Sequence, residues 1–559
     1  MIDWAQNNRI GIIVILALAV ILMAPFALRP REGRISRDTE RLVIISPHNE
    51  TIRSEFGAAF TRHMKETQGR DVVIDWRTPG GTSEITKILN SEFIAAFEHY
   101  WDDQEYDGWT EVATVFNDRK LPPPEPGASA NPGQTARQLF LNSSVGIGID
   151  LFWGGGSYDF QKQAGKGHLV AADPSGRYGI AALAKEKPEW FTEEIIPASF
   201  SGETFYDQGH RWVGTCLSSF GICYNSDSLE RLGITEAPST WADLADPRYF
   251  GQIALADPNK SGSVTKAFEM VLQQALREAV EDSISRPAPE GMSPEQVERR
   301  ALAEGWRQGM ARIQKITANA RYFTDSSTKI PLDVAQGDAA AGMCVDFYGR
   351  TYNEIHRKSD GSSRINYVMP EGGSSLTVDP VGLLRGAPHP ELAHAYLRFL
   401  LSKEGQRLWN YRPGTPGGPE KTAIRRLPVR RDMYGPEETK HFSDPEELPY
   451  QSGKSFTYEA EWTSSAFDSI RFIIRLMAID SHEEQQEAWK AIIDSGMSPR
   501  GLEIFSDLSI VSYEKATSDF ARILRSGNKR EQVETARSLG DLFRSLYADS
   551  IRASRMEGR

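Results

Sequence analysis

The chain has 559 residues and a formal net charge of −12, with 40% hydrophobic and 25% charged residues. A chain of this length is too long for one hydrophobic core, so we expect two or more domains. The proportions are those of a soluble globular protein, and the excess of acidic residues argues against a nucleic-acid partner, because such binding relies on basic residues that neutralise phosphates.

An apolar segment lies near the start of the chain. Residues Ile10 to Leu28 carry no charge and are numerous enough to cross a bilayer. The segment lacks both a small-residue cleavage site and a cysteine for lipid attachment, which favours an uncleaved, single-pass membrane anchor within residues 1–40. The arginines after the span, taken alone, would place the soluble part in the cytoplasm: Arg29, Arg31, Arg34 and Arg37.

Two units of strand, polar turn and helix follow. Arg41–Ser46 and Asp71–Trp76 are apolar runs typical of buried strands, and each leads through a polar turn into an amphipathic helical pattern. This alternation predicts an α/β domain. Ligands of open α/β sheets bind beyond the carboxyl ends of the strands. The turns therefore supply candidate ligand contacts: His48, Asn49, Gly81, Thr82 and Ser83.

The next segment interrupts the alternation. Residues 92–135 are rich in aromatic and acidic residues and then in proline and glycine, which predicts an inserted helix and loop. A strand pattern returns over Gly146–Phe152 and leads into Trp153, whose ring could pack on a ligand. Three glycines follow, and they serve either a tight turn or the close approach of a ligand to the backbone. This turn adds further candidates: Gly155, Gly156 and Ser157.

A long extended run, His210–Asn225, predicts a strand that passes from one lobe into another. The short strand Ile253–Ala256 then leads to a hydroxyl-rich helix start. Free backbone N–H groups and the positive end of the helix dipole favour an anion at such a start, and the hydroxyls add donors. The alternative is that a serine only caps the helix. The candidates here are Ser261, Gly262 and Ser263.

A similar hydroxyl-rich turn follows the strand Arg321–Phe323 and adds Asp325, Ser326 and Ser327. A strand over Ala339–Tyr348 would present Asp346 and Tyr348 at its end. Asp346 and Asp379 could accept hydrogen bonds from a hydroxyl or an amine, and Tyr348 could pack on a ring. The alternatives are that Asp379, which precedes a proline, only shapes a turn and that His48 only satisfies a loop.

The remaining sequence is mainly helical. Residues 271–318 predict helices that break at Arg286–Pro289, and Pro390–Leu408 predicts one amphipathic helix. Residues 434–559 continue as helices with apolar stripes. Such stripes usually face a core, so we expect this extension to pack on a lobe, and a docking helix for a partner is the alternative. One stripe consists of Ile470, Ile473, Ile474 and Met477.

Several short motifs occur in a fixed order within residues 41–433. They are Ser46–Asn49, Trp153–Gly156, Trp212 to Asn225, Trp241–Arg248, Asp257–Ser263, Asp379–Leu383 and Pro390–Ala395. This order resembles the extracellular solute-binding proteins of bacterial ABC importers, in the class that includes ferric-ion-, sugar-phosphate- and phosphonate-binding proteins. The resemblance implies a two-lobe α/β fold of the type II periplasmic-binding-protein kind, with the ligand between the lobes and hinge closure on binding.

The resemblance also implies delivery of a small-molecule solute to an ABC permease and a soluble part in the periplasm or outside the cell. This implication outweighs the arginine count for the orientation of the anchor. We expect the following domains: lobe 1 over 41–215 with its insertion at 92–135, lobe 2 over 216–374, a return to lobe 1 over 375–433, and a helical C-terminal extension over 434–559.

Two ligand classes remain open. The resemblance implies that a ferric-ion site would use a histidine and two adjacent tyrosines, which fall here at His48 and at Phe347–Tyr348, so one oxygen is missing. Several hydroxyl-rich helix starts instead favour phosphate, phosphonate or a phosphorylated sugar. We expect a membrane-anchored, extracytoplasmic binding component that captures a phosphate-bearing anion. The alternatives are an Fe(III) carrier using His48 and Tyr348, and a tethered sensor or scaffold with no transport role.

Motifs of enzymes are incomplete. Gln451–Ser455 resembles the end of a P-loop, but Leu448 stands in place of the first glycine, and neither HExxH nor GxSxG occurs. We expect no catalysis, no cofactor and no metal other than Fe(III) as an alternative ligand. The three cysteines lie in apolar runs and predict buried thiols, with a Cys216–Cys223 bridge as the alternative: Cys216, Cys223 and Cys344.

Overall fold

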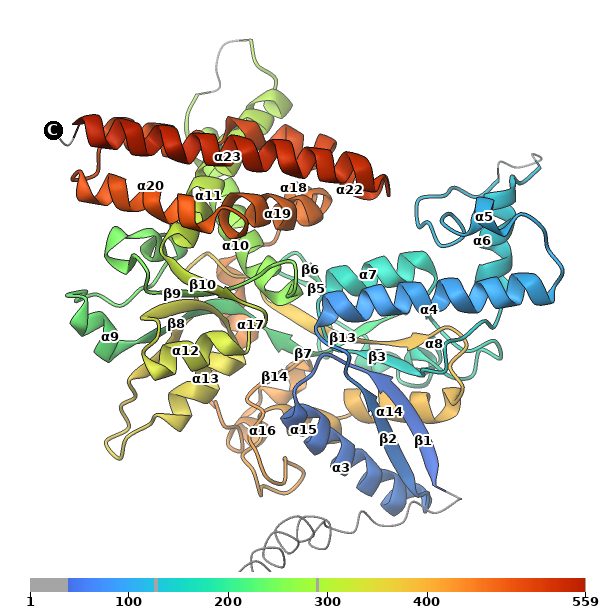
Figure 1. Ribbon diagram of the computed structural model, residues 1–559. Coiled ribbons are helices and arrows are strands. Elements are labelled where there is room, and N and C mark those ends of the chain that lie inside the picture. Colours follow the sequence, from blue (N-terminus) through green and yellow to red (C-terminus); the bar gives the residue numbers. More distant parts are fainter. Residues whose placement is uncertain (1–38, 125–128, 288–290, 558–559) are drawn as a thin grey trace, which may run out of the picture. The chain divides into compact units, whose positions relative to one another are not determined.

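The computed structural model describes residues 39–124, 129–287 and 291–557 (Figure 1). The predicted membrane anchor, Ile10–Leu28, lies outside the described residues. Within the described ranges, no helix combines the length and the apolar character needed to cross a membrane. The contacts divide the chain into two compact units, Met1–Arg41 with Thr61–Val73 and Leu42–Phe60 with Ile74–Arg559.

The smaller unit holds the start of β1 (Glu40–Ile45), the end of α3 (Glu50–Gln68) and the start of β2 (Val72–Arg77). Within this unit, the Arg70 guanidinium donates to the Glu40 carboxylate, with 2.7 Å between Nε and Oε1. The Thr61 hydroxyl donates to the carbonyl of Val72 at 3.1 Å. These bonds join the end of the helix to the two strands.

The first sheet has seven strands in the order β14-β7-β13-β3-β1-β2, with β4 paired to β13. Its further strands are β3 (Leu151–Trp153), β4 (Leu169–Val170), β7 (Val213–Ser218), β13 (Thr377–Leu384) and β14 (Leu427–Pro428). Strands β1 and β3 are parallel, whereas β13 is antiparallel to β3 and β7. The helices near it include α4 (Thr82–Asp103), α7 (Ser157–Lys166), α8 (Ile180–Glu186), α14 (Pro390–Leu401) and α15 (Lys403–Asn410), and Figure 1 shows α4 and α7 on one face with α14 on the other.

The second sheet has five strands in the order β10-β9-β11-β8-β12. They are β8 (Phe220–Asn225), β9 (Ile253–Ala256), β10 (Ala320–Thr324), β11 (Ala341–Val345) and β12 (Ile365–Val368), and a separate pair is formed by β5 (Ser199–Phe200) and β6 (Glu203–Thr204). The accompanying helices are α9 (Ser226–Arg231), α10 (Gly262–Ser285), α11 (Pro294–Ala318), α12 (Lys329–Gln336) and α13 (Asp346–Ile355).

Two segments cross from one sheet to the other. The extended run predicted to pass between lobes divides into β7 in the first sheet and β8 in the second, with Ser219 between them. The return segment joins β12 to β13. This confirms a mixed α/β fold organised around two sheets. The first crossing falls at Ser219, a few residues beyond the predicted boundary at 215–216.

Three local predictions were wrong. The strand predicted to end at Tyr348 stops at Val345, and Asp346 begins α13. A carboxylate in the first turn is stabilised by the positive end of the helix dipole. The helix predicted over Pro390–Leu408 divides at Ser402, whose hydroxyl caps α15 by accepting from Gly405 N at 3.2 Å. The strand predicted from Gly146 begins only at Leu151, because Gly148 adopts a left-handed φ of 72°.

The insertion begins later than predicted. Helix α4 continues without a break to Asp103, so the separate segment starts after this residue and contains α5 (Trp109–Val112) and α6 (Pro132–Asn142). Aromatic rings hold it on the end of α4. Phe97 lies 4.6 Å from Phe116 and 5.2 Å from Phe140 between ring centroids. This explains the aromatic composition, which supplies the insertion with its own small core.

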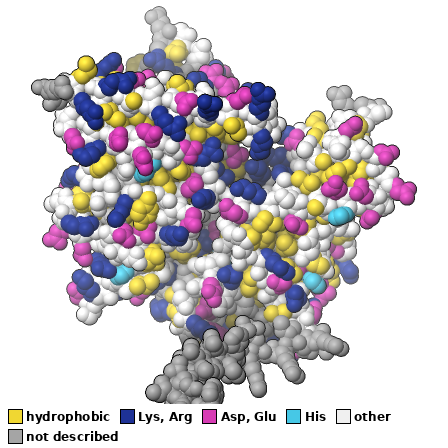
Figure 2. All heavy atoms as spheres, in the orientation of Figure 1, with side chains coloured by type: hydrophobic (Ala, Val, Ile, Leu, Met, Phe, Trp, Pro, Cys, Tyr) yellow, Lys and Arg dark blue, Asp and Glu magenta, His cyan; other side chains and the backbone are white. Residues whose placement is uncertain are grey.

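The C-terminal extension packs against the second sheet, as predicted. Ile470, Ile473 and Met477 are fully buried in the same core as the strands β8, β9 and β11. Its helices are α16 (Pro436–Thr439), α17 (Pro449–Ser452), α18 (Ala460–Thr463), α19 (Phe467–Ile474), α20 (His482–Asp494), α21 (Pro499–Phe505), α22 (Ala521–Arg525) and α23 (Lys529–Glu557). Acidic and basic side chains are interspersed on the face shown in Figure 2.

A buried amide ties the extension to this core. The Asn319 side chain donates to the carbonyls of Leu244 and Asp246 at 2.9 and 2.8 Å, and it accepts from Trp489 Nε1 on α20 at 2.8 Å. Asn319 is fully buried, so the loss of any of these three bonds would leave an unpaired polar group in the core. The cysteines Cys216, Cys223 and Cys344 are buried and free, which excludes the alternative disulfide.

Candidate functional site

A cavity of about 590 Å³ lies where turns from both sheets meet a part of the C-terminal extension. This volume suits a small solute. Most of the predicted contacts line it, although their contact with a ligand stays a prediction. These residues are His48, Asn49, Gly81, Thr82, Gly155, Gly156, Ser157, Ser261, Gly262, Ser263, Asp325, Ser326, Ser327, Tyr348 and Asp379.

Three predicted contacts lie outside the cavity lining. Ser83 is the second residue of α4 and is buried beside the cavity-facing Thr82. Asp346 is buried and accepts from Arg350 Nη2 at 2.7 Å, so its carboxylate serves the start of α13. Trp153 is fully buried under the His48 ring, with 4.4 Å between ring centroids. Trp153 therefore supports a cavity residue and cannot pack on a ligand.

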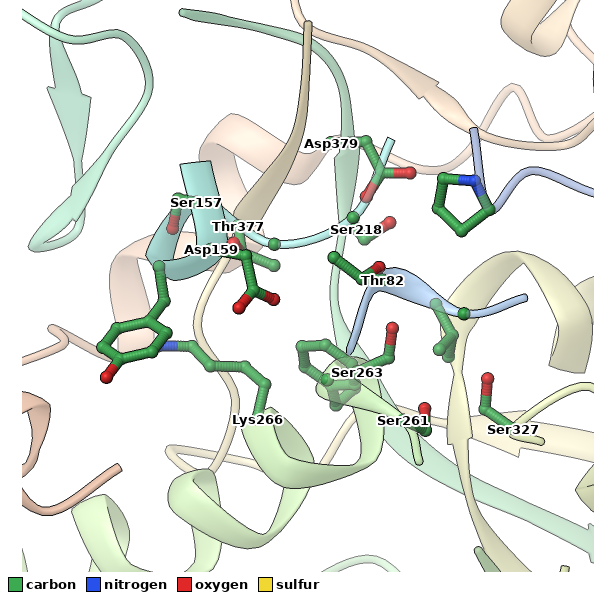
Figure 3. A pocket seen from close by; sticks show the side chains of 18 of the residues that line it. Thr82, Ser157, Asp159, Ser218, Ser261, Ser263, Lys266, Ser327, Thr377 and Asp379 are labelled. Carbon is green, nitrogen blue, oxygen red and sulfur yellow. The ribbon is translucent and has the colours of Figure 1, made fainter. Parts of the chain in front are cut away.

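Helices α4, α7 and α10 all begin at the cavity. The N-cap residues of α4 and α7 are Gly81 and Gly156, which provide no side-chain cap. The Ser261 hydroxyl accepts from Val264 N at 3.4 Å, so the capping interpretation holds for this serine. Among the described residues, the first-turn hydroxyls of three helices that line the cavity have no hydrogen-bond partner, and Figure 3 labels them: Thr82, Ser157 and Ser263.

The glycine turn after β3 brings α4 and α7 together. Gly155 has a φ of 117°, and a Cβ on it would lie 2.7 Å from the Thr82 hydroxyl oxygen. Gly154 has a φ of 96°, and a Cβ there would lie 2.7 Å from the His48 ring. Both positions therefore require glycine for the turn and for the close approach. Gly156 has open space around its Cβ position, so its backbone is accessible to a ligand.

The turn before α12 is partly engaged in local bonds. The Asp325 carboxylate pairs with the Lys329 ammonium at 2.7 Å, and the Ser326 and Thr328 hydroxyls lie 2.9 Å apart. Ser327 keeps a hydroxyl that points to the cavity (Figure 3). This turn accordingly offers fewer free donors than the starts of α4, α7 and α10.

An ion pair forms the inner side of the cavity. The Asp379 carboxylate accepts from the Arg426 guanidinium and from His48 Nε2, the latter at 3.1 Å. Arg426 also donates to Ser218, and its guanidinium lies 4.5 Å from the Phe347 ring centroid. Burial would raise the pKa of Asp379, but Arg426 and His48 outweigh it and lower this pKa. Asp379 is thus an ionised partner of Arg426 and His48 and not merely a turn former.

The histidine is held neutral. Burial is the main cause that lowers the pKa of His48, although Asp379 opposes it. Because the ionised Asp379 can only accept, Nε2 carries the proton and donates to it. Nδ1 is buried and has no hydrogen-bond partner among the described residues.

A second charged cluster was missed by the sequence analysis. Lys266 Nζ lies 2.8 Å from Glu203 and 2.9 Å from Glu269, and 3.4 Å above the Tyr458 ring. Burial would lower the pKa of Lys266, but the two carboxylates raise it, so the ammonium stays charged. The sequence did indicate part of this cluster, because two charged residues, Lys266 and Glu269, interrupt the apolar pattern of α10. Glu203 and Tyr458 are remote in sequence and gave none.

Two more groups define the chemistry of the cavity. The Asp159 carboxylate faces it and forms no ion pair within 4 Å among the described residues, and burial raises its pKa. Burial also raises the pKa of Tyr348 to about 12, so its phenol is protonated at neutral pH. In the described ranges, no three or more His, Cys, Asp or Glu side chains gather in a way that could hold a metal ion.

Residues 193–426 match the family model described as "Bacterial extracellular solute-binding protein". The chain is similar to that family over this segment. The resemblance seen in the sequence motifs is confirmed for it. The segment contains both crossings between the sheets, together with Asp379, Arg426, Lys266 and the start of α10.

Two relatives are similar over parts of their length. An uncharacterized protein of Haemophilus influenzae is 25% identical over 256 residues, which are 46% of this chain and 59% of that protein. The phosphoglycerate transport regulatory protein PgtC of Salmonella typhimurium is 24% identical over 217 residues, 39% of this chain and 43% of that protein. The chain therefore spans about half the length of the curated relatives it matches. The activity and partners of the whole protein are consequently proposals.

One solved structure of similar extent is the periplasmic binding protein AfuA of Actinobacillus pleuropneumoniae, with fructose-6-phosphate bound. It is 17% identical, has a TM-score of 0.44, and the match covers 78% of this chain and 99% of that one.

The buried ion pair predicts a strong energetic coupling between Asp379 and Arg426. Replacing Arg426 by Met leaves the Asp379 charge buried, and we expect a loss of about 3–5 kcal/mol of unfolding free energy. The double variant, Asp379→Asn with Arg426→Met, should lose about 1–3 kcal/mol less unfolding free energy than the two single variants lose in sum. Urea denaturation of the four proteins measures this. The exposed pair Arg307 and Glu304, 2.9 Å apart, is the control, and its Met/Gln cycle should couple by less than about 1 kcal/mol because solvent screens it. Equal coupling in both cycles would contradict the prediction.

The same ion pair predicts a pH dependence. Because the pKa of Asp379 is lower in the folded state, its contribution is fully present above the ordinary carboxyl value of 3.8 and is lost as pH falls through the folded pKa. The stability difference between wild type and Asp379→Asn should hold from pH 7 to 5 and shrink toward pH 3. Asp333, whose pKa is raised by burial, should give the opposite trend in Asp333→Asn. Parallel trends for the two variants would refute this assignment.

Proposed function

We propose that the chain is the solute-binding component of an ABC importer and that it captures a small, phosphate-bearing anion in the cavity. The family of residues 193–426 supports a binding role and not a catalytic one. One observation carries the choice of ligand. The first-turn hydroxyls of Thr82, Ser157 and Ser263 come from three different helices, lack partners among the described residues and line one cavity.

Donors dominate this part of the cavity. The starts of α4 and α7 have no side-chain cap, so their first backbone N–H groups remain available beside the hydroxyls. The dipole of each helix places partial positive charge at its start in the cavity lining, which favours an oxyanion there. A phosphate has enough acceptor oxygens to receive hydrogen bonds from all three helix starts at once, and bonds to a charged acceptor are the stronger kind.

Four of the six acidic side chains in the lining contact a basic side chain, and Glu84 and Asp159 have no such contact among the described residues. Asp379 pairs with Arg426, and Glu203 and Glu269 share Lys266. A phosphate at the helix starts therefore meets a compensated Asp379, and the ammonium of Lys266 offsets one of the two charges of Glu203 and Glu269. The Asp159 carboxylate remains as an acceptor for a hydroxyl of the solute, which fits a phosphorylated hydroxy compound. The name of the Salmonella relative, a phosphoglycerate transport regulatory protein, adds support for this class.

The Fe(III) alternative has less support. Fe(III) prefers anionic oxygen ligands, but the Tyr348 phenol is protonated at neutral pH and Phe347 offers no oxygen. His48 Nε2 is engaged by Asp379. Binding of iron through these two residues would require the Tyr348 phenol to lose its proton, and His48 would have to release Asp379 from Nε2 or bind through its buried Nδ1.

Solute binding can be tested with the full chain in detergent. We expect thermal stability to rise with a phosphorylated sugar or phosphoglycerate and not with putrescine or Fe(III) citrate. A ligand at a hundred times its Kd should add about 2.7 kcal/mol. Ser157→Ala with Ser263→Ala should weaken binding at least about 100-fold, because each lost bond to a charged group is worth about 1.5–3 kcal/mol.

Ser293→Ala is the control for these serines. Ser293 caps α11, away from the cavity, so its loss should lower stability by about 1 kcal/mol without changing affinity. A shift with Fe(III) that is lost in Tyr348→Phe would replace the phosphate proposal by the iron alternative. The absence of any shift would favour a tethered sensor or scaffold.

We further propose that Ile10–Leu28 anchors the chain in the membrane, with the binding cavity in the periplasm or outside the cell next to its permease. The segment is uncharged and long enough to cross a bilayer, which supports anchoring whichever side the cavity faces. The full chain should stay in the membrane pellet after carbonate extraction, whereas a chain lacking residues 1–38 should be released. External protease should degrade it in intact spheroplasts. Protection from protease would place the cavity on the cytoplasmic side and refute the importer role.

A further inference from the structure

The C-terminal extension contributes residues to the cavity. The segment Phe456–Arg471, called the C-terminal wall below, lies beyond the residues that match the family, which end at 426. Four of its residues line the cavity: Tyr458, Ala460, Ser464 and Phe467. The lining that binds the solute therefore includes a part that the family match does not cover.

The C-terminal wall is fixed to elements near the first sheet. Tyr458 N donates to the carbonyl of Ser201 at 2.8 Å, next to the β5–β6 turn. A Cβ on Gly202 would collide with the carbonyl of Tyr458, so this position needs glycine. On α7, the Tyr158 ring lies 4.4 Å from the Phe467 ring, and the Lys162 ammonium lies 3.6 Å from the carboxylate of Asp468, the next residue.

The C-terminal wall is also fixed to α10, which packs on the second sheet. The hydroxyls of Tyr458 and Thr463 both donate to Glu269, at 2.8 and 2.6 Å. The Gln273 side chain donates to the carbonyl of Glu459 at 2.8 Å and accepts from its N–H at 3.1 Å. Glu269 also holds Lys266, so the charged cluster of the cavity and the C-terminal wall share one carboxylate.

We propose that the C-terminal wall selects solutes by the size of the part that extends from the phosphate. Ala460 and Ser464 are exposed at the cavity and lie four residues apart, with Phe467 three residues further. Contacts on both sides prevent this segment from yielding to a larger ligand. Selection between solutes rests on the proposed function, in which phosphate occupies the starts of α4, α7 and α10. The limit that the C-terminal wall sets on access to the cavity does not depend on the proposed function.

The access test needs no solute. The three native cysteines are buried, so a cysteine at Ser263 is a probe of the cavity with a low background. We would measure its alkylation in the full chain by iodoacetamide and by a bulky fluorescein maleimide. Adding Ser464→Trp should slow the bulky reagent at least about tenfold and the small reagent much less, because added volume excludes only large molecules.

Glu461→Trp is the matched control. Glu461 is exposed in the C-terminal wall, on α18 just before Ser464, but does not line the cavity, so the same bulk there should leave both rates unchanged. A second variant, Tyr158→Phe with Asp468→Asn, weakens the contacts to α7 and should speed the bulky reagent. If Ser464→Trp behaves like Glu461→Trp, the C-terminal wall does not limit access and the inference is wrong.

A second measurement tests selection itself. In Ser464→Trp, the affinity for fructose 6-phosphate should fall at least about tenfold relative to that for inorganic phosphate. An equal change for both ligands would overturn selection by size. If the wild-type chain binds neither ligand, the proposed function fails, and the alkylation rates still decide whether the C-terminal wall limits the cavity.

Discussion

The buried ion pair between Asp379 and Arg426 sets the inner side of the binding cavity. Asp379 lies in β13 at an irregularity in its pairing with β7, and Arg426 directly precedes β14 on the other side of β7. The pair joins strands that are far apart in the sequence, and His48 joins it from the turn after β1. The guanidinium then covers the Phe347 ring at the start of α13. Because these charges are buried, each requires the others to remain in place, and the surrounding turns take their positions from them.

Around this pair, the cavity separates two kinds of chemistry. The starts of α4, α7 and α10 offer hydroxyl and backbone donors that the protein does not use itself. The cluster of Lys266, Glu203 and Glu269 has two carboxylates around one ammonium, so it keeps one net negative charge, and Tyr458 links it to the C-terminal extension. In the proposed function the anion lies at the first part, which offers the donors, and the ammonium of Lys266 reduces the repulsion from the second. The Asp159 carboxylate between them supplies an acceptor, so a solute with both a phosphate and a hydroxyl matches the arrangement.

The C-terminal extension belongs to the core of the second sheet and to the cavity at the same time. Its apolar stripes are buried with β8, β9 and β11, and Asn319 connects that core to Trp489. A segment held so firmly presents Ser464 and Phe467 to the cavity as a fixed surface. The extension therefore bears on binding through its position, even though its sequence carries no binding motif.

The sequence by itself determined the alternation of strands, polar turns and helices, the extended run that crosses between sheets, and the turns that line the cavity. These features depend on local periodicity and on where glycine and hydroxyl residues interrupt it, which a single sequence displays. It missed the end of β11 and the division at Ser402, because both depend on capping and packing rather than periodicity.

Only the tertiary structure decided how the charges are paired. Arg426 lies 47 residues from Asp379, and Tyr458 lies 189 residues from Glu269, so no spacing in the sequence indicates either contact. The structure likewise removed Asp346, Ser83 and Trp153 from the cavity. Whether a polar side chain faces a ligand or a buried partner depends on which distant segment packs beside it, and local sequence does not contain that information.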